Sequence, residues 1–200
     1  VLWLVPGIVP WFYFAEAMNT GTSCLQEYDY LVKKVVFYVQ ILPVIKLISC
    51  LIVHGIFVLI MIGMYFCFGH LPKVTWIQLI YYTFALSLFV LGWTLITASI
   101  NVFFKDMAQI VSIALQFGMW LVPIMWDPTM FQNRPAWLDS VLEINPIYYI
   151  VMGYRDSMLQ GNWFFERPML TIYFWIWTIV MLMIGLKVFH KLRPHLSDVL

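Results

Sequence analysis

The sequence predicts an all-α integral membrane protein, built as a polytopic bundle of helices. Hydrophobic residues make up 63% of its 200 residues and charged residues 10%, whereas soluble domains have about 45–50% and 25%. Several apolar segments carry no charge and approach the roughly 20 residues that a helix needs to cross a bilayer. Their polarity does not alternate along the chain, so we expect helices and not barrel strands.

Five spans are visible, and the first of them is apolar from its first residue. No basic stretch precedes it, so we do not expect a cleaved signal peptide and treat this span as truncated. With one more span before it, the protein would have six. The visible spans lie at residues about 1–17, 41–69, 75–101, 107–126 and 168–187.

Basic residues in the connecting segments predict which end of the bundle faces the cytoplasm. Alternate segments lie on the same side, and the two sets hold seven and four basic residues. By the positive-inside rule, the richer set and the C-terminus are cytoplasmic. The richer set is Lys33, Lys34, Lys46, Lys105, Lys187, Lys191 and Arg193, and the other is Lys73, Arg134, Arg155 and Arg167.

A cytoplasmic helix is predicted after the first span, at residues about 27–40. Apolar residues recur there at three- and four-residue spacing between Leu31 and Val39, which is typical of an amphipathic helix lying along the membrane interface. Lys33 and Lys34 fall off this apolar stripe. Either they contact anionic lipid headgroups, or the helix docks on a cytoplasmic partner.

The next cytoplasmic connection is the short turn Asn101–Asp106 between two charge-free spans. Its adjacent Lys105 and Asp106 are ordinary for a solvated turn. Taken alone, the turn does not indicate a site.

The outer region, at residues about 128–160, is broken by prolines, which interrupt helices. Its apolar pieces, 138–144 and 147–159, are suited to dip back into the membrane. Irregular backbone at that depth must be buried in protein or line a wet cavity, so we expect a re-entrant element that caps a pathway. The Trp and Tyr rings there either stack on sugars or form an interfacial belt. Arg155 either pairs with Asp156 or meets a phosphate.

Other kinds of site find little support. The net charge of +1 gives no field for nucleic acid, and the three cysteines form neither a disulfide framework nor a zinc pair. Phosphate-cradling, serine hydrolase and metalloprotease motifs are missing from the sequence. His54 lies within a span, and it is either a functional residue or a hydrogen-bonding partner of a neighbouring helix.

Taken together, these segments resemble the permease subunit of the type-2 ABC exporters that move polysaccharides, O-antigens and teichoic acids (polyol phosphate polymers). The resemblance is nearest to the teichoic-acid exporters of Gram-positive bacteria. The matching pieces cover essentially the whole chain in the family's order. They are Pro10–Ala17, Leu31–Val35, Ile41–Pro43, Asn101–Asp106, Pro123–Trp126, Asn145–Pro146, Tyr154–Asp156 and Asp198–Leu200.

The resemblance implies a six-span half-transporter in a bacterial plasma membrane. It would pair with a second copy of itself and with two copies of a cytoplasmic ATP-binding subunit. ATP and Mg would bind to that partner, so this chain would have no catalytic residue, metal or cofactor. The cargo would be a lipid-linked polymer that slides along an aromatic-lined channel to the outer side.

The resemblance also assigns roles to residues. Coupling to the ATPase and gating at the cytoplasmic side would rest on Lys33, Lys34, Lys105 and Asp106. Two departures from the family's pattern occur here, since Lys105 stands where an Arg is usual and Tyr38 where many members have Pro. The outer gate and translocation path would include Trp120, Pro123, Trp126, Asn145, Pro146, Tyr148, Tyr149, Tyr154 and Arg155.

Two other functions stay open at this point. A membrane-embedded transferase acting on a lipid-linked sugar would need acids or a His–Asp pair at one membrane face. The acids Asp127, Asp139, Glu143 and Asp156 are all in the outer region but fit no recognisable motif. A purely structural membrane subunit predicts no loss of activity when Lys34 or Arg155 is changed.

Overall fold

Every regular element that the structure describes is helical, which confirms the predicted all-α class. The computed structural model describes residues 2–28, 39–126 and 141–199, and these ranges contain no strand. The α-helices are α1 (Val5–Glu27), α3 (Ile41–Cys67), α4 (Gln78–Phe103), α5 (Met107–Leu121), α7 (Pro146–Arg155) and α8 (Pro168–Val199). Short turns of other helix types are η1 (Val74–Ile77), η3 (Asp156–Gln160) and η4 (Phe164–Glu166).

Three segments of the described chain are long and apolar enough to cross a membrane, so the protein is a multi-pass membrane protein. They are Ile41–Cys67, Val74–Phe103 and Pro168–Pro194. Helix α5 is apolar but shorter. Helix α1 is long enough, but Glu16, Asn19 and Thr20 lie within it and lower its hydropathy.

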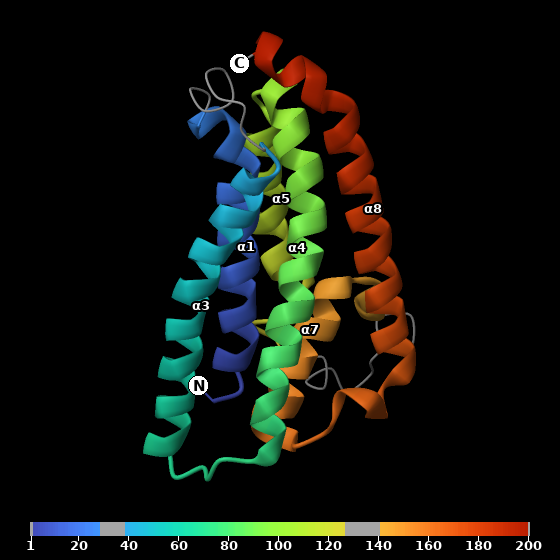
Figure 1. The fold of residues 1–200 in the computed structure, drawn as a ribbon. Helices are drawn as coiled ribbons and strands as arrows, with labels where there is room; N and C mark the ends of the chain where they lie inside the picture. The colour runs from blue at the N-terminus through green and yellow to red at the C-terminus, as the bar shows by residue number, and fades with distance from the viewer. Residues whose placement is uncertain (1, 29–38, 127–140, 200) are drawn as a thin grey trace.

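The bundle is built around α4, which packs against α1 on one side and α8 on the other (Figure 1). Helix α3 packs on the outer side of α1, so α3 and α8 form opposite edges of the bundle. The two edge helices bury about a sixth of their most apolar stretch (17% each), whereas α4 buries 56%. Helix α4 is therefore the core element, and α3 and α8 present most of their surface to the surroundings.

The contact between α4 and α8 brings the two backbones together. A Cβ atom added to Gly185 would lie 2.6 Å from the backbone oxygen of Gly92. Small residues allow this kind of close approach, and van der Waals packing then stabilises the helix pair without a hydrophobic driving force.

The bundle has two distinct ends (Figure 1). One end, called here the α7 end, holds the connection from α3 to η1 together with η3 and η4. The other, the C-terminal end, holds the end of α1, the turn between α4 and α5, and the end of α8. Helix α7 begins partway along α4 and runs toward the α7 end.

Two predicted segments fall partly outside the described residues. Helix α1 continues to Glu27, past the expected end of the first span near residue 17. Most of the predicted cytoplasmic helix at 27–40 is outside the described ranges, as are residues 128–140 of the outer region.

Candidate functional site

Helix α7 starts where it does because Asn145 and Pro146 suit the first turn of a helix. The side-chain oxygen Oδ1 of Asn145 accepts the backbone N–H of Ile147 at 3.0 Å, which satisfies one of the donors that a helix start leaves unpaired. Pro146 lies in the first turn, where the N–H it lacks has no partner in any case. The helix passes into the π-helical turn η3, which ends at Gly161 with a left-handed φ of 85°.

Arg155, at the end of α7, is buried with only 2% of its surface exposed. Its Nη2 donates to the backbone oxygen of Ile124 at 2.8 Å, and its Nε donates to that of Trp3 at 3.4 Å. The guanidinium carbon lies 3.5 Å from the centre of the Trp3 ring, a cation–π contact. A Cβ on Gly7 would come within 2.8 Å of Nη2. One side chain thus connects α7 to the start of α1 and to the segment after α5.

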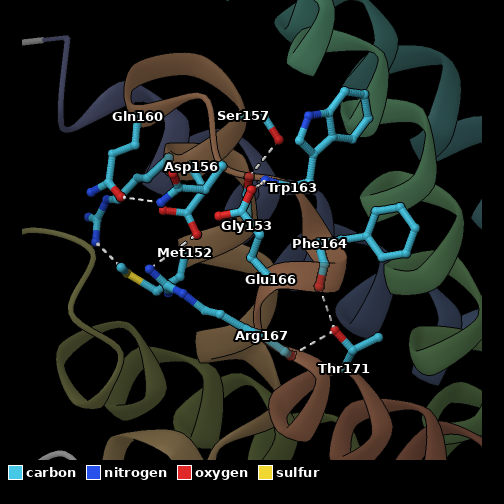
Figure 2. A network of polar contacts seen from close by, with 12 residues as sticks. Met152, Gly153, Asp156, Ser157, Gln160, Trp163, Phe164, Glu166, Arg167 and Thr171 are labelled. Carbon is cyan, nitrogen blue, oxygen red and sulfur yellow. Dashed lines mark hydrogen bonds and ion pairs between the residues drawn. The ribbon is translucent and has the colours of Figure 1, made fainter.

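Asp156 pairs with Arg167, so the predicted alternative of an Arg155–Asp156 pair is wrong. The distance from Asp156 Oδ2 to Arg167 Nη2 is 3.4 Å. Consecutive residues of a helix point in different directions, and this sends Arg155 toward α1 and Asp156 toward η4. Burial raises the pKa of Asp156, and the Arg167 charge opposes that rise. Figure 2 shows Asp156 of η3 and Arg167, the residue before α8.

The same turn is closed by a second acid. Glu166 Oε1 accepts the backbone N–H of Trp163 at 3.0 Å, and the hydroxyl oxygen of Thr171 lies 3.0 and 3.1 Å from the backbone oxygens of Phe164 and Arg167. These contacts also appear in Figure 2. They fix the connection from η3 to α8 and thereby the C-terminal end of α7.

Tyr149 attaches α7 to two long helices. Its hydroxyl lies 3.1 Å from the hydroxyl of Tyr81 on α4 and 3.2 Å from the hydroxyl of Thr171 on α8. The indole N–H of Trp175 donates to the same Tyr81 hydroxyl at 2.8 Å. This chain of hydroxyls holds α7 in the angle between α4 and α8.

Tyr154 attaches the other face of α7. Its hydroxyl lies 2.6 Å from the hydroxyl of Thr83 on α4 and 2.9 Å from Nε2 of His54 on α3. With Arg155 bonded to Trp3 before α1, polar side chains of α7 reach all four long helices or their ends.

The remaining predicted outer residues lie near the end of α5. Pro123, Asn145 and Tyr148 line a small cavity of about 130 Å³. The indole N–H of Trp126 donates to the backbone oxygen of Trp120 at 3.0 Å, and the Trp120 ring is 70% exposed. The structure therefore brings Pro123 together with the start of α7. Trp120 lies in the last turn of α5, and Trp126 follows the end of that helix.

The predicted coupling residues lie away from α7. Lys105 and Asp106 are exposed in the turn between α4 and α5, at the C-terminal end of the bundle (Figure 1). Lys33 and Lys34 lie outside the described residues.

Asn101, which the sequence did not single out by itself, organises the turn beside Lys105. Its Nδ2 donates to the backbone oxygen of Thr22 at 3.2 Å, and its Oδ1 accepts the backbone N–H of Ala108 at 3.0 Å. Gln26 in turn donates to the backbone oxygen of Asn101 at 2.7 Å. A buried amide thus joins α1, α4 and α5. The signal for it was an uncharged polar residue at the end of a charge-free span.

A cavity of about 430 Å³ lies between α5 and the rest of the bundle. Thr97 and Asn145 are the polar side chains among its lining residues, so the wall is almost wholly apolar. Rings from three helices dominate it: Trp11, Phe14, Phe89, Trp93 and Trp177. Such a surface makes apolar, weakly directional contacts. Within the described ranges, no three His, Cys, Asp or Glu side chains are placed to hold a metal ion.

Comparison with known proteins gives a consistent match. The sequence pattern of the family described as ABC-2 type transporter matches residues 1–159. An O-antigen export system permease protein RfbA of Klebsiella pneumoniae is 23% identical over 204 residues, which cover 100% of this chain and 75% of that protein. A protein of the same name from Myxococcus xanthus is 25% identical over 201 residues, covering 96% of this chain and 73% of that protein.

Proposed function

The chain belongs to the ABC-2 type transporter family, and on that premise we propose that it is the permease subunit of an ATP-driven polysaccharide exporter. It moves a lipid-linked polysaccharide from the cytoplasmic leaflet to the outer side of a bacterial plasma membrane. The chain is the transport component, and a partner subunit binds ATP and Mg and hydrolyses the ATP.

The observation that carries this proposal is the extent of the match to export permeases. The alignment with the Klebsiella pneumoniae protein covers the whole chain, so it includes both the spans and the outer region with α7. The relatives described above are named for O-antigen export and not for teichoic acid. We therefore prefer a polysaccharide as cargo over a polyol phosphate polymer.

We place the partner subunits at the C-terminal end of the bundle. Two ATP-binding subunits and a second copy of this chain complete the transporter. The exposure of Lys105 and Asp106 supports a contact there, because their charged side chains are accessible to a partner. Lys33 and Lys34, which belong to the same end by the positive-inside rule, complete the coupling surface.

The topology follows from this placement. The C-terminus is cytoplasmic, and α1, α3, α4, α5 and α8 represent five of six spans. Helix α7 is re-entrant, and two features support this: it has ten residues, which is too short for a span, and it begins partway along α4 (Figure 1).

Helix α7 and the segment after α5 form the outer gate in this proposal. The predicted gate residues Pro123, Asn145 and Tyr148 line one cavity, and Arg155 bonds to Ile124 in the same segment. ATP-driven movement begins at the opposite end. Asn101 supports a route for it, since this amide joins the turn at Lys105 to both α1 and α5.

The aromatic cavity beside α5 suits a moving chain. Its rings offer apolar faces to sugars or to the lipid carrier, and each contact can be made and broken at modest cost. Its scarcity of polar groups favours the lipid carrier as the part of the cargo that lies there.

The test is an export assay on the full-length protein with its partner subunit. We expect an ATP-hydrolysing subunit to co-purify in mild detergent, and surface polysaccharide to disappear when the gene for this chain is deleted. The double variant Lys33→Glu, Lys34→Glu should abolish export while the protein still inserts, and Gln109→Ala on α5 serves as a control. A protein that repeatedly purifies alone, in cells whose surface polysaccharide survives the deletion, would refute the proposal.

A further inference from the structure

The intramembrane histidine has a defined polar environment at the crossing of four helices. His54 is 3% exposed, and its Nε2 lies 2.9 Å from the Tyr154 hydroxyl of α7 and 3.4 Å from the Thr83 hydroxyl of α4. Tyr154 and Thr83 are themselves 2.6 Å apart. The three polar atoms form a triangle contributed by α3, α4 and α7.

The Tyr154 hydroxyl is the shared member of these bonds. A neutral imidazole has one donor and one acceptor nitrogen, and the His54 ring also meets the backbone of Val9 on α1. Whether Nε2 donates to the Tyr154 oxygen or accepts its proton, the same hydroxyl bonds both to His54 and to Thr83.

The fourth helix, α1, packs against the His54 ring. The Tyr13 ring lies over the His54 ring with centroids 4.7 Å apart, while its hydroxyl bonds to Ser87 of α4 at 2.7 Å. Tyr13 thus holds the imidazole in place without touching the Tyr154 hydroxyl. Tyr13 and Tyr154 differ in what their hydroxyls connect. The Tyr13 hydroxyl joins α1 to α4, whereas the Tyr154 hydroxyl joins α7 to α3 and α4.

We propose that His54 and Thr83 are positioning residues that hold α7 in its closed position through the hydroxyl of Tyr154. The inference rests on the proposed role of α7 as the outer gate and names one contact that holds that gate shut. Helix α3 presents most of its surface to the surroundings, and His54 is one of its few buried residues. Breaking the triangle therefore releases α7 from α3 without removing a core helix. A few hydrogen bonds in a membrane interior are weak enough to be broken during each transport cycle.

The experiment measures how readily a cysteine beside the gate reacts when ATP is absent. Ser157 is buried in η3 immediately after α7, and Ser157→Cys changes its size little. The full-length protein, with its partner subunit, carries this probe after Cys24, Cys50 and Cys67 have been changed to Ala. A membrane-impermeant thiol reagent is added from outside in the absence of ATP, and the labelling rate is compared between variants.

We expect Tyr154→Phe and His54→Leu each to raise the labelling rate about threefold to tenfold, the range for one or two interhelical hydrogen bonds in a membrane. The double variant should label no faster than either single variant, because both break the same triangle. Tyr13→Phe is the matched control and should stay within about twofold of the parent. His54→Gln keeps an N–H donor and should restore slow labelling, which a change in packing alone would not do.

Equal labelling in Tyr154→Phe, His54→Leu and the parent would overturn the proposal, as would an equal rise in Tyr13→Phe. If Tyr154→Phe does not fold, the pair His54→Leu and His54→Gln decides the question. The proposed function has its own readout, ATP-dependent export by the parent protein. A parent that shows no export refutes the exporter role, whereas slow labelling in all variants refutes the triangle alone.

Discussion

Helices α7 and α5 are the two shortest α-helices of the described chain, yet the bundle holds them in opposite ways. Seven of the ten residues of α7 are buried, and its tyrosines and Arg155 bond to four other parts of the chain. Helix α5 has 15 residues and only Val111 among them is buried. It is the more apolar of the two, so apolarity did not decide burial. In a bilayer the lipid tails solvate an apolar helix, and a helix is fixed in place by polar side chains and close packing.

The largest effect is expected where α7 meets α4 with no spare room. A Cβ on Gly153 would overlap ring atoms of Tyr82, and that ring is itself buried. We expect Gly153→Ala to lower the unfolding free energy by about 3 kcal/mol, the upper range of overpacking, measured as thermal unfolding in detergent. Gly63→Ala on α3, where nothing lies within 4 Å of the added atom, is the control. Equal melting of both variants would show that α7 is not tightly packed.

Arg155 should come next in effect. Arg155→Met keeps the length of the side chain but leaves the carbonyls of Ile124 and Trp3 without this donor, which costs about 2–3 kcal/mol. We expect weaker export and a matching loss of thermal stability. Arg167→Lys, which keeps a charge beside Asp156 at a partly exposed site, should change either quantity little. Normal export by Arg155→Met would show that the gate does not depend on this side chain.

One matched pair of substitutions tests the comparison directly. Ile150 of α7 is fully buried, and Ile113 of α5 is 42% exposed. Ile150→Ala should lower the unfolding free energy by about 2 kcal/mol because it leaves a cavity. Ile113→Ala should lower it by less than about 0.5 kcal/mol, and thermal unfolding in detergent measures both. If Ile113→Ala destabilises the assembled transporter as much as Ile150→Ala does, another chain covers α5 there. The difference in burial between α7 and α5 then holds for the isolated subunit only.

The smallest effect concerns the point that anchors α5. Asn101→Ala removes the acceptor for the Ala108 N–H and the donor to Thr22. We expect the unfolding free energy to fall by about 1 kcal/mol. We also expect ATP hydrolysis to continue while export slows, which is the more diagnostic result. Gln109→Ala, one turn into α5 and exposed, should leave both rates unchanged. Unimpaired export in Asn101→Ala would remove this amide from the coupling route.

Sequence patterns predicted three of the five expected spans, those that contain α3, α4 and α8, because length and lack of charge are local properties. The tertiary role of single polar residues was harder to predict. The adjacency of Arg155 and Asp156 suggested a pair, but helix geometry sends them to different partners. His54 and Asn101 were visible as polar residues in or beside spans, yet their partners lie 100 and 79 residues away in the chain. Such distances have no signature in a single sequence.

The order of synthesis along the chain bears on how α7 enters the membrane. The residues that bond to α7 mostly precede it in the sequence: Trp3, His54, Thr83 and Ile124. The ribosome therefore releases most of the surface that binds α7 before α7 itself is made. A ten-residue segment that carries an arginine is a poor substrate for insertion by its own hydrophobicity. Helix α7 would insert by binding to helices that are already in the membrane. Helix α8, synthesised last, would then pack against it through the contact of Thr171 with Tyr149.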